Sequence, residues 1–171
     1  GSNVGGDGGG GNVPFDPCVP TTFTDGDTSQ QIDPGCGLFV DPNNANAGTG
    51  TKADPYQSLQ AALDAHGAGV PIYIAGAGSL SGSFTTTRGG AIYGGLTSSF
   101  SRDSSLRPSL LSDPSVSSVA LILQLNPQEN MLLDSLVILG GDKSTDIDGT
   151  SIAVLVQGGN LRVRNCQVVG G

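Results

Sequence analysis

The sequence predicts an all-β fold in which short strands wind into a coil, with one helix near its start. Only 13% of the 171 residues are charged, and the acidic ones are fourteen Asp and one Glu, whereas helical surfaces draw on Glu, Lys, Arg and Ala. Short apolar runs alternate with Gly, Pro, Asn and Asp, which favours strands and turns. Part of the C-terminal third also repeats at a fixed offset. A mostly helical protein is therefore excluded, and the length suits one domain with a core.

Charge is concentrated at the start of the chain. Residues 1–57 carry −6 of the net charge of −8, and the other 114 residues carry −2. Seven basic residues supply no face that would neutralise phosphates, so a nucleic-acid-binding module is excluded. No apolar run approaches eighteen residues, so no membrane span is predicted. The composition of residues 1–12 is that of a flexible Gly-rich leader or tether.

Three cysteines indicate the compartment. Cys18 and Cys36 lie in an entry segment, residues 13–37, that has too few apolar residues to order itself by burial. A disulfide there would supply roughly 3 kcal/mol in the chain-entropy model and would imply an oxidising compartment. Two free thiols are the alternative, and zinc is disfavoured because the one histidine, His66, lies far along the chain. Cys166 lies in an apolar strand pattern and is interpreted as a small buried hydrophobe.

The secondary-structure elements follow in order from these signals. The first strand is predicted over residues 37–40, and a helix over about 58–66 begins at the N-cap Ser58 and ends at Gly67. Its apolar face holds Leu59, Ala62 and Leu63. Further strands are predicted over residues 72–74, 83–86, 91–93, 109–111, 120–125, 131–139, 151–156 and 161–169.

An internal repeat aligns residues 131–141 with residues 161–171 at an offset of thirty. Apolar positions match apolar positions, and a Gly-Gly pair ends each copy. In each copy the alternation breaks at a small polar residue, Ser135 or Asn165, so that the apolar face resumes inward after a bend. A coil with an interior needs this bend, whereas a flat sheet does not.

This pattern resembles the right-handed parallel β-helix. The stretches FVDPNNANAGTGTKADPYQSLQAALDA (39–65) and IYGGLTSSFSRD (92–103) resemble the opening of secreted and cell-surface proteins of the pectate-lyase-like superfamily. The resemblance implies a right-handed single-stranded parallel β-helix over residues 38–171, with the helix at 58–66 capping its N-terminal end.

Two further expectations concern the ends of the chain. The uncapped C-terminal rung suggests either the N-terminal part of a longer solenoid or end-to-end association with a partner. The leader resembles the segment that follows the lipidated cysteine of bacterial lipoproteins, so a lipid anchor and simple secretion stay open. Either location is secreted or on the outer surface.

Carboxylates gather in the loop 140–151. Asp142, Asp146 and Asp148 form a candidate calcium site, although the loop lacks the spacing and the closing Glu of a helix-loop-helix calcium site. A solvated turn and catalytic carboxylates are the alternatives. Asp25 and Asp27 form a similar Asp-Gly-Asp piece that is interpreted as a turn. No catalytic residue is assigned, and calcium is the one cofactor considered.

Alternation within the repeat places a few polar side chains outside the coil. Arg162 and Arg164 would point outward, and Asp134 would lie beneath Arg164 as a surface ion pair. Tyr73 and Tyr93 hold matched places and are expected to stack as a ladder rather than to form a sugar platform. His66 is expected on the surface at the helix end.

These features favour a non-enzymatic scaffold or adhesin-like domain, secreted or on the outer surface. Its loops, such as 140–151, would be presented to a glycan or a protein partner. The alternative is the capping end of a polysaccharide lyase or glycoside hydrolase whose catalytic rungs lie outside this chain.

Overall fold

The protein is mostly β and its sheets are parallel. The structure is a computed structural model that describes residues 13–113, 115, 117–141 and 152–170. Two short helices occur in this part, a 3-10 turn η1 (Pro20–Thr22) and the helix α1 (Leu59–Ala65). The strands are β1 (Leu38–Val40), β2 (Pro71–Ala75), β3 (Ser79–Ser81), β4 (Phe84–Thr86), β5 (Gly90–Leu96), β6 (Ser109–Leu111), β7 (Val119–Gln124), β8 (Asn130–Asp134), β9 (Val137–Leu139), β10 (Ile152–Gln157), β11 (Asn160–Arg164) and β12 (Gln167–Val169).

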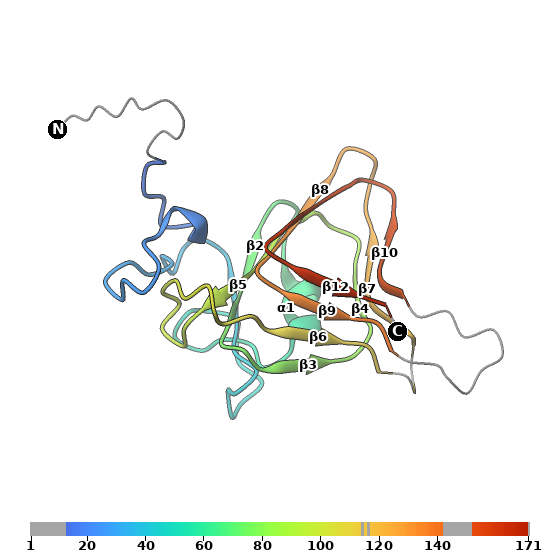
Figure 1. Cartoon of the computed structure of the whole chain (residues 1–171), viewed down its shortest axis with the longest axis horizontal. Helices are drawn as coiled ribbons and strands as arrows, with labels where there is room; N and C mark the ends of the chain where they lie inside the picture. The colour runs from blue at the N-terminus through green and yellow to red at the C-terminus, as the bar shows by residue number, and fades with distance from the viewer. Residues whose placement is uncertain (1–12, 114, 116, 142–151, 171) are drawn as a thin grey trace.

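The strands form three sheets around a common interior (Figure 1). One sheet has the order β1-β2-β5-β8-β11, the second β3-β6-β9-β12 and the third β4-β7-β10. From β2 onward the chain visits the three sheets in turn, so each strand from β5 to β12 pairs with the strand three places earlier. All these pairings are parallel. We call this arrangement the three-sided stack.

The predicted repeat sets the register at the C-terminal end. Met131 lies beside Leu161 in β8 and β11, and Ile138 lies beside Val168 in β9 and β12, as the offset of thirty requires. The predicted bend is also present, because Ser135 and its counterpart Asn165 adopt left-handed backbone with φ of 59° and 53°. Small polar residues tolerate this conformation better than β-branched ones.

The interior of the stack is a continuous aliphatic core. Ile72, Ile92 and Leu133 are aligned by register in β2, β5 and β8, and all three are fully buried. The helix α1 begins where predicted, since the Ser58 hydroxyl accepts a hydrogen bond from the amide of Ala61 (3.3 Å). Its buried face, Leu59, Ala62 and Leu63, joins the same core.

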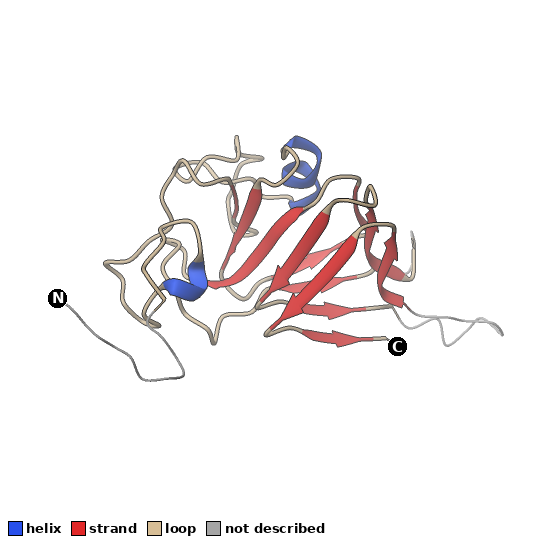
Figure 2. Cartoon of the chain, turned by 90° about the horizontal axis from the view of Figure 1, so that it is seen from above, coloured by secondary structure: helices blue, strands red, loops and turns tan. Residues whose placement is uncertain are grey.

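The N-terminal end of the stack is closed. Residues 50–56 cover the free edge of β1: the amide of Phe39 donates to the carbonyl of Gly50 (3.0 Å), and the amide of Tyr56 donates to the carbonyl of Phe39 (2.8 Å). The helix α1 lies at this end, and the C-terminal strand lies at the opposite end (Figure 2). Covering an end of the stack protects unpaired strand edges from association.

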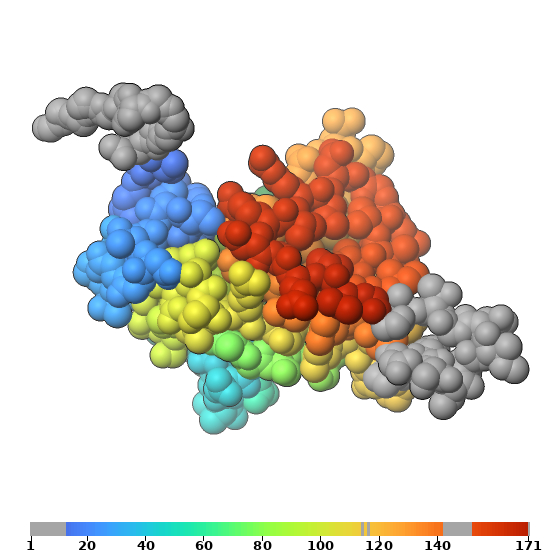
Figure 3. Space-filling model, viewed as in Figure 1, coloured from blue at the N-terminus to red at the C-terminus, as the bar shows by residue number. Residues whose placement is uncertain are grey.

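A second core lies outside the stack, between the five-stranded sheet and the entry segment. Phe23 and Ile32 of that segment are buried against outward-facing aromatic residues of β1, β2 and β5. The predicted disulfide between Cys18 and Cys36 is present. Figure 3 shows the blue entry segment against the yellow stretch that includes residues 97–106, where the amide of Ile32 donates to the carbonyl of Phe100 (2.9 Å).

One strand was missed from the sequence. β3 has a single apolar residue, Leu80, between two serines, so no apolar run marks it. It is a strand because β6 pairs with it and because Leu80 is buried in the inner core.

Candidate functional site

The outer face of the five-stranded sheet carries a row of aligned side chains. Register places Phe39, Tyr73, Tyr93, Asp134 and Arg164 side by side across its five strands. The row therefore changes from aromatic residues at the closed end to an ion pair at the other end.

The aromatic part of the row is a buried ladder. The rings of Tyr73 and Tyr93 stack with centroids 5.5 Å apart and planes 10° apart, which confirms the predicted ladder. The Tyr73 hydroxyl donates to the carbonyl of Cys18 (2.7 Å), so it ties the disulfide to the sheet. Burial raises the pKa of both phenols. These rings hold the entry segment against the sheet.

The ion pair at the end of the row joins one exposed and one buried side chain. Arg164 donates from Nε (2.8 Å) and Nη2 (2.7 Å) to Oδ2 of Asp134, so the predicted stacked pair exists. The expectation of a surface bridge is wrong, because Asp134 is fully buried while the Arg164 side chain is 43% exposed. The Ser135 hydroxyl donates to Oδ1 of Asp134 (2.8 Å) and so satisfies the other oxygen.

Arg102 connects this ion pair to the entry segment. It is buried, and its Nη2 donates to the Ser135 hydroxyl (3.3 Å), while its carbonyl accepts from the amide of Gly26 (2.9 Å). Among the described residues its Nη1 has no hydrogen-bond partner. Gly95 packs beside this guanidinium: a Cβ there would lie 2.6 Å from Nη1, and its φ of 68° also favours glycine.

A groove adjoins this row on the same outer face, and we call it the outer groove. It consists of two cavities of about 620 and 450 Å³ that share Gly90, Asn130 and Leu132. Small residues form much of the floor, which leaves space above the strands, and both cavities are open to solvent. Its lining includes Cys18, Val19, Pro71, Ala91, Tyr93, Glu129, Asn160, Leu161 and Arg162.

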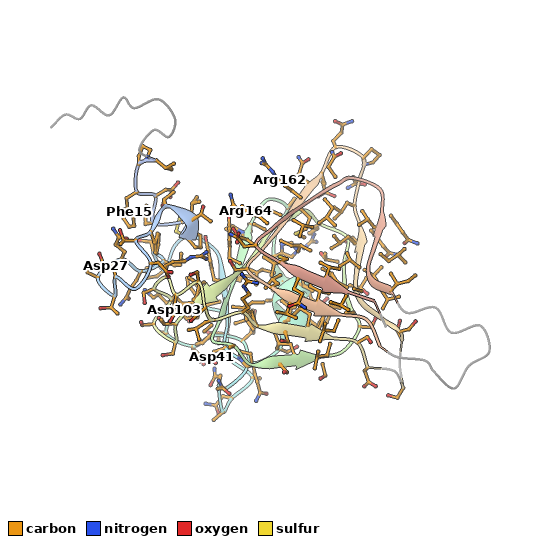
Figure 4. The ribbon with its side chains drawn as sticks, viewed as in Figure 1. Phe15, Asp27, Asp41, Asp103, Arg162 and Arg164 are labelled. Atoms are coloured by element: carbon orange, nitrogen blue, oxygen red, sulfur yellow. A yellow bond between two sulfur atoms is a disulfide. The ribbon has the colours of Figure 1, made fainter. Side chains whose placement is uncertain are left out.

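The rim of the outer groove is polar. Asn130 and Asn160 are exposed and lie side by side in register, and Arg162 lies two residues beyond Asn160 in β11, on the same face of the sheet. Arg162 and Arg164 project from the same side of β11 (Figure 4). In the part of the chain that the structure describes, no carboxylate lies within 4 Å of the guanidinium of Arg162. The rim therefore offers two amides and one cation to a ligand.

The carboxylate of Glu129, at the groove, is hydrogen-bonded to backbone amides. Its carboxylate accepts from the amides of Asn126 (3.0 Å) and Gly89 (3.2 Å), and these bonds hold the pKa of Glu129 below its usual range. It therefore fixes the turn before β8 as an ionised acceptor.

His66 is buried, so the prediction of a surface histidine is wrong. Its Nε2 lies 3.1 Å from the Thr86 hydroxyl and its Nδ1 lies 3.3 Å from the carbonyl of Val70. Burial lowers the pKa of His66. Thr86 is twenty residues away on β4, which is why the sequence did not reveal the contact.

The candidate calcium ligands Asp142, Asp146 and Asp148 lie outside the described residues, as does most of the loop 140–151. In the part of the chain that the structure describes, no group of three or more His, Cys, Asp or Glu side chains could hold a metal. Asp25 accepts from Ser104 (2.8 Å to its amide) and Asp27 from Ser29 (2.9 Å to its amide). Asp27 therefore stabilises a turn within the entry segment, and Asp25 ties that segment to the loop that contains Ser104.

Cys166 is a free, half-buried cysteine that packs against the inner core. Burial raises the pKa of its thiol. This environment fits the interpretation as a small apolar side chain, because a reactive thiol needs a lowered pKa.

No protein-family model, curated protein or solved structure matches this chain significantly. Within the described residues, neither helix is long and apolar enough to cross a membrane.

Proposed function

We propose that the chain is a secreted or outer-surface binding and scaffold domain of the right-handed parallel β-helix type, which holds a glycan in the outer groove. The observation that carries the proposal is the groove itself: an open channel with amide and guanidinium groups along its rim. The loop 140–151 lies outside the described residues for the most part, so the proposal rests on the groove and not on that loop.

The topology supports the β-helix part of the proposal. Strands return to the same sheet at every third place and pair in parallel, as in a coil of rungs. Connections between parallel strands of one sheet are right-handed in nearly all proteins, which favours the right-handed sense. The closed end under α1 matches the capping role that the resemblance to pectate-lyase-like proteins implies.

The chemistry of the groove favours a polyhydroxylated polymer. Side-chain amides both donate and accept hydrogen bonds, as sugar hydroxyls do, and Arg162 adds a cationic donor. An open channel admits an extended chain, whereas small-molecule sites usually enclose most of their ligand. Asn130, Asn160 and Arg162 would therefore contact successive parts of a glycan.

Binding is favoured over catalysis because the carboxylates beside the groove are engaged. Glu129 accepts two backbone hydrogen bonds, and Asp134 is neutralised by Arg164. A general base needs a carboxylate that is free to take a proton from the substrate.

The disulfide supports the location. A bridge between Cys18 and Cys36 persists in an oxidising compartment, such as the periplasm or the cell surface. The proposal includes two routes to this location: simple secretion, and attachment to a membrane through a lipid anchor.

The test is a glycan array with the purified chain, followed by calorimetry on any glycan that binds. We expect Ala91→Trp, which fills the floor, and Arg162→Ala, which removes the cation, to weaken binding by roughly tenfold each. Gln167→Ala, an exposed change on another sheet, is the matched control and is expected to bind as the unmodified chain does.

Two outcomes would contradict the proposal. Unchanged affinity in both groove variants would place the binding surface elsewhere. Release of unsaturated uronates from polyuronates by the chain would favour the alternative, a polysaccharide-degrading enzyme.

A further inference from the structure

Another cavity lies at the closed end of the stack, away from the outer groove. Its volume is about 310 Å³, and we call it the end pocket. It lies between α1 and β4, which contact each other at this end of the molecule (Figure 1). The lining includes Gln60, Leu63 and Asp64 of α1, and Thr85, Thr87 and Arg88 in and after β4.

Gln60 joins the two walls of the end pocket. Its Nε2 donates to the carbonyl of Thr85 (2.9 Å) and its Oε1 accepts from the amide of Thr85 (2.9 Å), so it bonds the edge of β4 as a neighbouring strand would. The same Nε2 also donates to Oδ1 of Asp64 (2.8 Å). These bonds engage the side chain of Gln60 and fix the Asp64 carboxylate at the pocket.

Arg88 is held at the pocket by backbone bonds. Its Nη1 donates to the carbonyl of His66 (2.8 Å), and its amide donates to the Thr86 hydroxyl (3.2 Å). The buried ring of His66 lies against the same hydroxyl, with Nε2 3.1 Å away. The guanidinium is therefore anchored through one nitrogen, and its remaining N–H groups are donors for a ligand.

The carboxylate and the guanidinium line one cavity without pairing. Over residues 13–113, 115, 117–141 and 152–170, no basic nitrogen lies within 4 Å of the Asp64 carboxylate and no carboxylate oxygen lies within 4 Å of the Arg88 guanidinium. Both side chains are exposed, so a ligand can reach them. Charge-assisted hydrogen bonds are about twice as strong as neutral ones, so a ligand with both opposite charges gains more here than a neutral sugar.

We propose that the end pocket binds a small zwitterion of the size of a free α-amino acid, with its ammonium group on Asp64 and its carboxylate on Arg88. The Thr85 and Thr87 hydroxyls add neutral donors and acceptors, and Leu63 supplies an apolar contact. The volume is at the small end of the range for ligand pockets, which suits a ligand of this size. The outer groove is a separate site, so this inference does not depend on the proposed function.

The test is titration of the purified chain with glycine and L-serine, followed in the two-dimensional amide NMR spectrum. We expect the amides of Thr85 and Thr87 and the side-chain amide of Gln60 to shift, with a dissociation constant of roughly 1 mM. Acetate lacks the ammonium group and ethylamine lacks the carboxylate, so each should bind at least about tenfold more weakly than L-serine.

Two variants separate the two charges. Asp64→Asn removes the negative charge and keeps an acceptor for Gln60, so it should weaken L-serine binding at least about tenfold without weakening acetate binding. Arg88→Gln removes the cation and should weaken L-serine by about the same factor. Both positions are exposed, so both variants should fold. Arg162→Gln removes a cation from the outer groove and is the matched control, which should bind L-serine as the unmodified chain does.

The proposal is overturned if these amide signals do not shift at about 20 mM L-serine. It is also overturned if D-glucose binds as tightly as L-serine, because the pocket would then be a sugar site. Equal weakening of L-serine by Arg162→Gln and Arg88→Gln would overturn it as well, since the effect would not belong to the end pocket.

Discussion

The two faces of the five-stranded sheet are built in different ways. The inner face aligns Ile72, Ile92 and Leu133, which are aliphatic and come from a pattern repeated along the chain. The outer face aligns Tyr73 and Tyr93 under an entry segment that comes from another part of the chain and is held by a disulfide. The inner core thus depends on a pattern that recurs from strand to strand, whereas the outer core depends on the packing of one separate segment onto the sheet.

The largest effect is expected from a charge on the inner face. Leu133→Asp would bury a carboxylate without a partner in the aliphatic core, and we expect it to lower the free energy of unfolding by more than about 4 kcal/mol. Chemical denaturation followed by circular dichroism measures this change.

The neighbouring residue provides the control. Leu132 points to the outer face and is partly exposed, so Leu132→Asp should cost less than about 1.5 kcal/mol. Equal losses in the two variants would mean that the two faces do not differ as described.

The disulfide is expected to have the next largest effect, confined to the outer core. Replacing Cys18 and Cys36 by alanine should lower the stability of the entry segment by about 3 kcal/mol in the chain-entropy model. Hydrogen exchange at Ile32, whose amide bonds to Phe100, should quicken while exchange in β8 stays slow.

Cys166→Ala is the matched control, since this cysteine lies in the stack and forms no disulfide. If exchange in β8 quickens as much as at Ile32 in the double variant, the outer core is not a separate unit.

The smallest expected effect concerns His66, which lies beside α1 at the closed end. Burial lowers the pKa of His66 below 6.5, so the unfolded chain binds a proton more readily than the folded chain does. The free energy of unfolding should therefore decrease as pH falls through about 6.5, by at most about 1.4 kcal/mol per pH unit.

Thermal unfolding between pH 7 and pH 5 tests this, with His66→Gln as the variant that removes the titrating group. The pH dependence in this interval should become flatter in the variant. An unchanged profile would assign the dependence to other groups.

The sequence predicted the parts of the fold that are marked by a repeated spacing or by a capping residue. The offset of thirty foretold the pairing of Met131 with Leu161, and Ser58 foretold the start of α1. The sequence did not predict β3, because a single leucine between two serines shows no alternation of apolar and polar residues. The packing of the entry segment on the sheet was also not predictable, since its contacts join residues 20, 55 and 79 positions apart and follow no repeated spacing.

The candidate site was less predictable than the fold for the same reason. The outer groove is formed by the entry segment together with four strands, and only the run Gly89, Gly90 and Ala91 indicated a face without large side chains. The outward direction of Arg162 and the pairing of Arg164 with Asp134 followed from alternation and the repeat. The burial of Asp134 did not, because it depends on Ser135 in a left-handed corner and on Arg102.

The order in which strands pair also has a consequence for folding during synthesis. From β5 onward every strand joins a strand that precedes it in the chain, so its partner already exists when it emerges from a ribosome. The chain can therefore fold progressively from the end closed by α1, adding one strand at a time. When strands are added one at a time in this way, each strand finds its partner by closing a short loop, and no search for partners along the whole chain is needed.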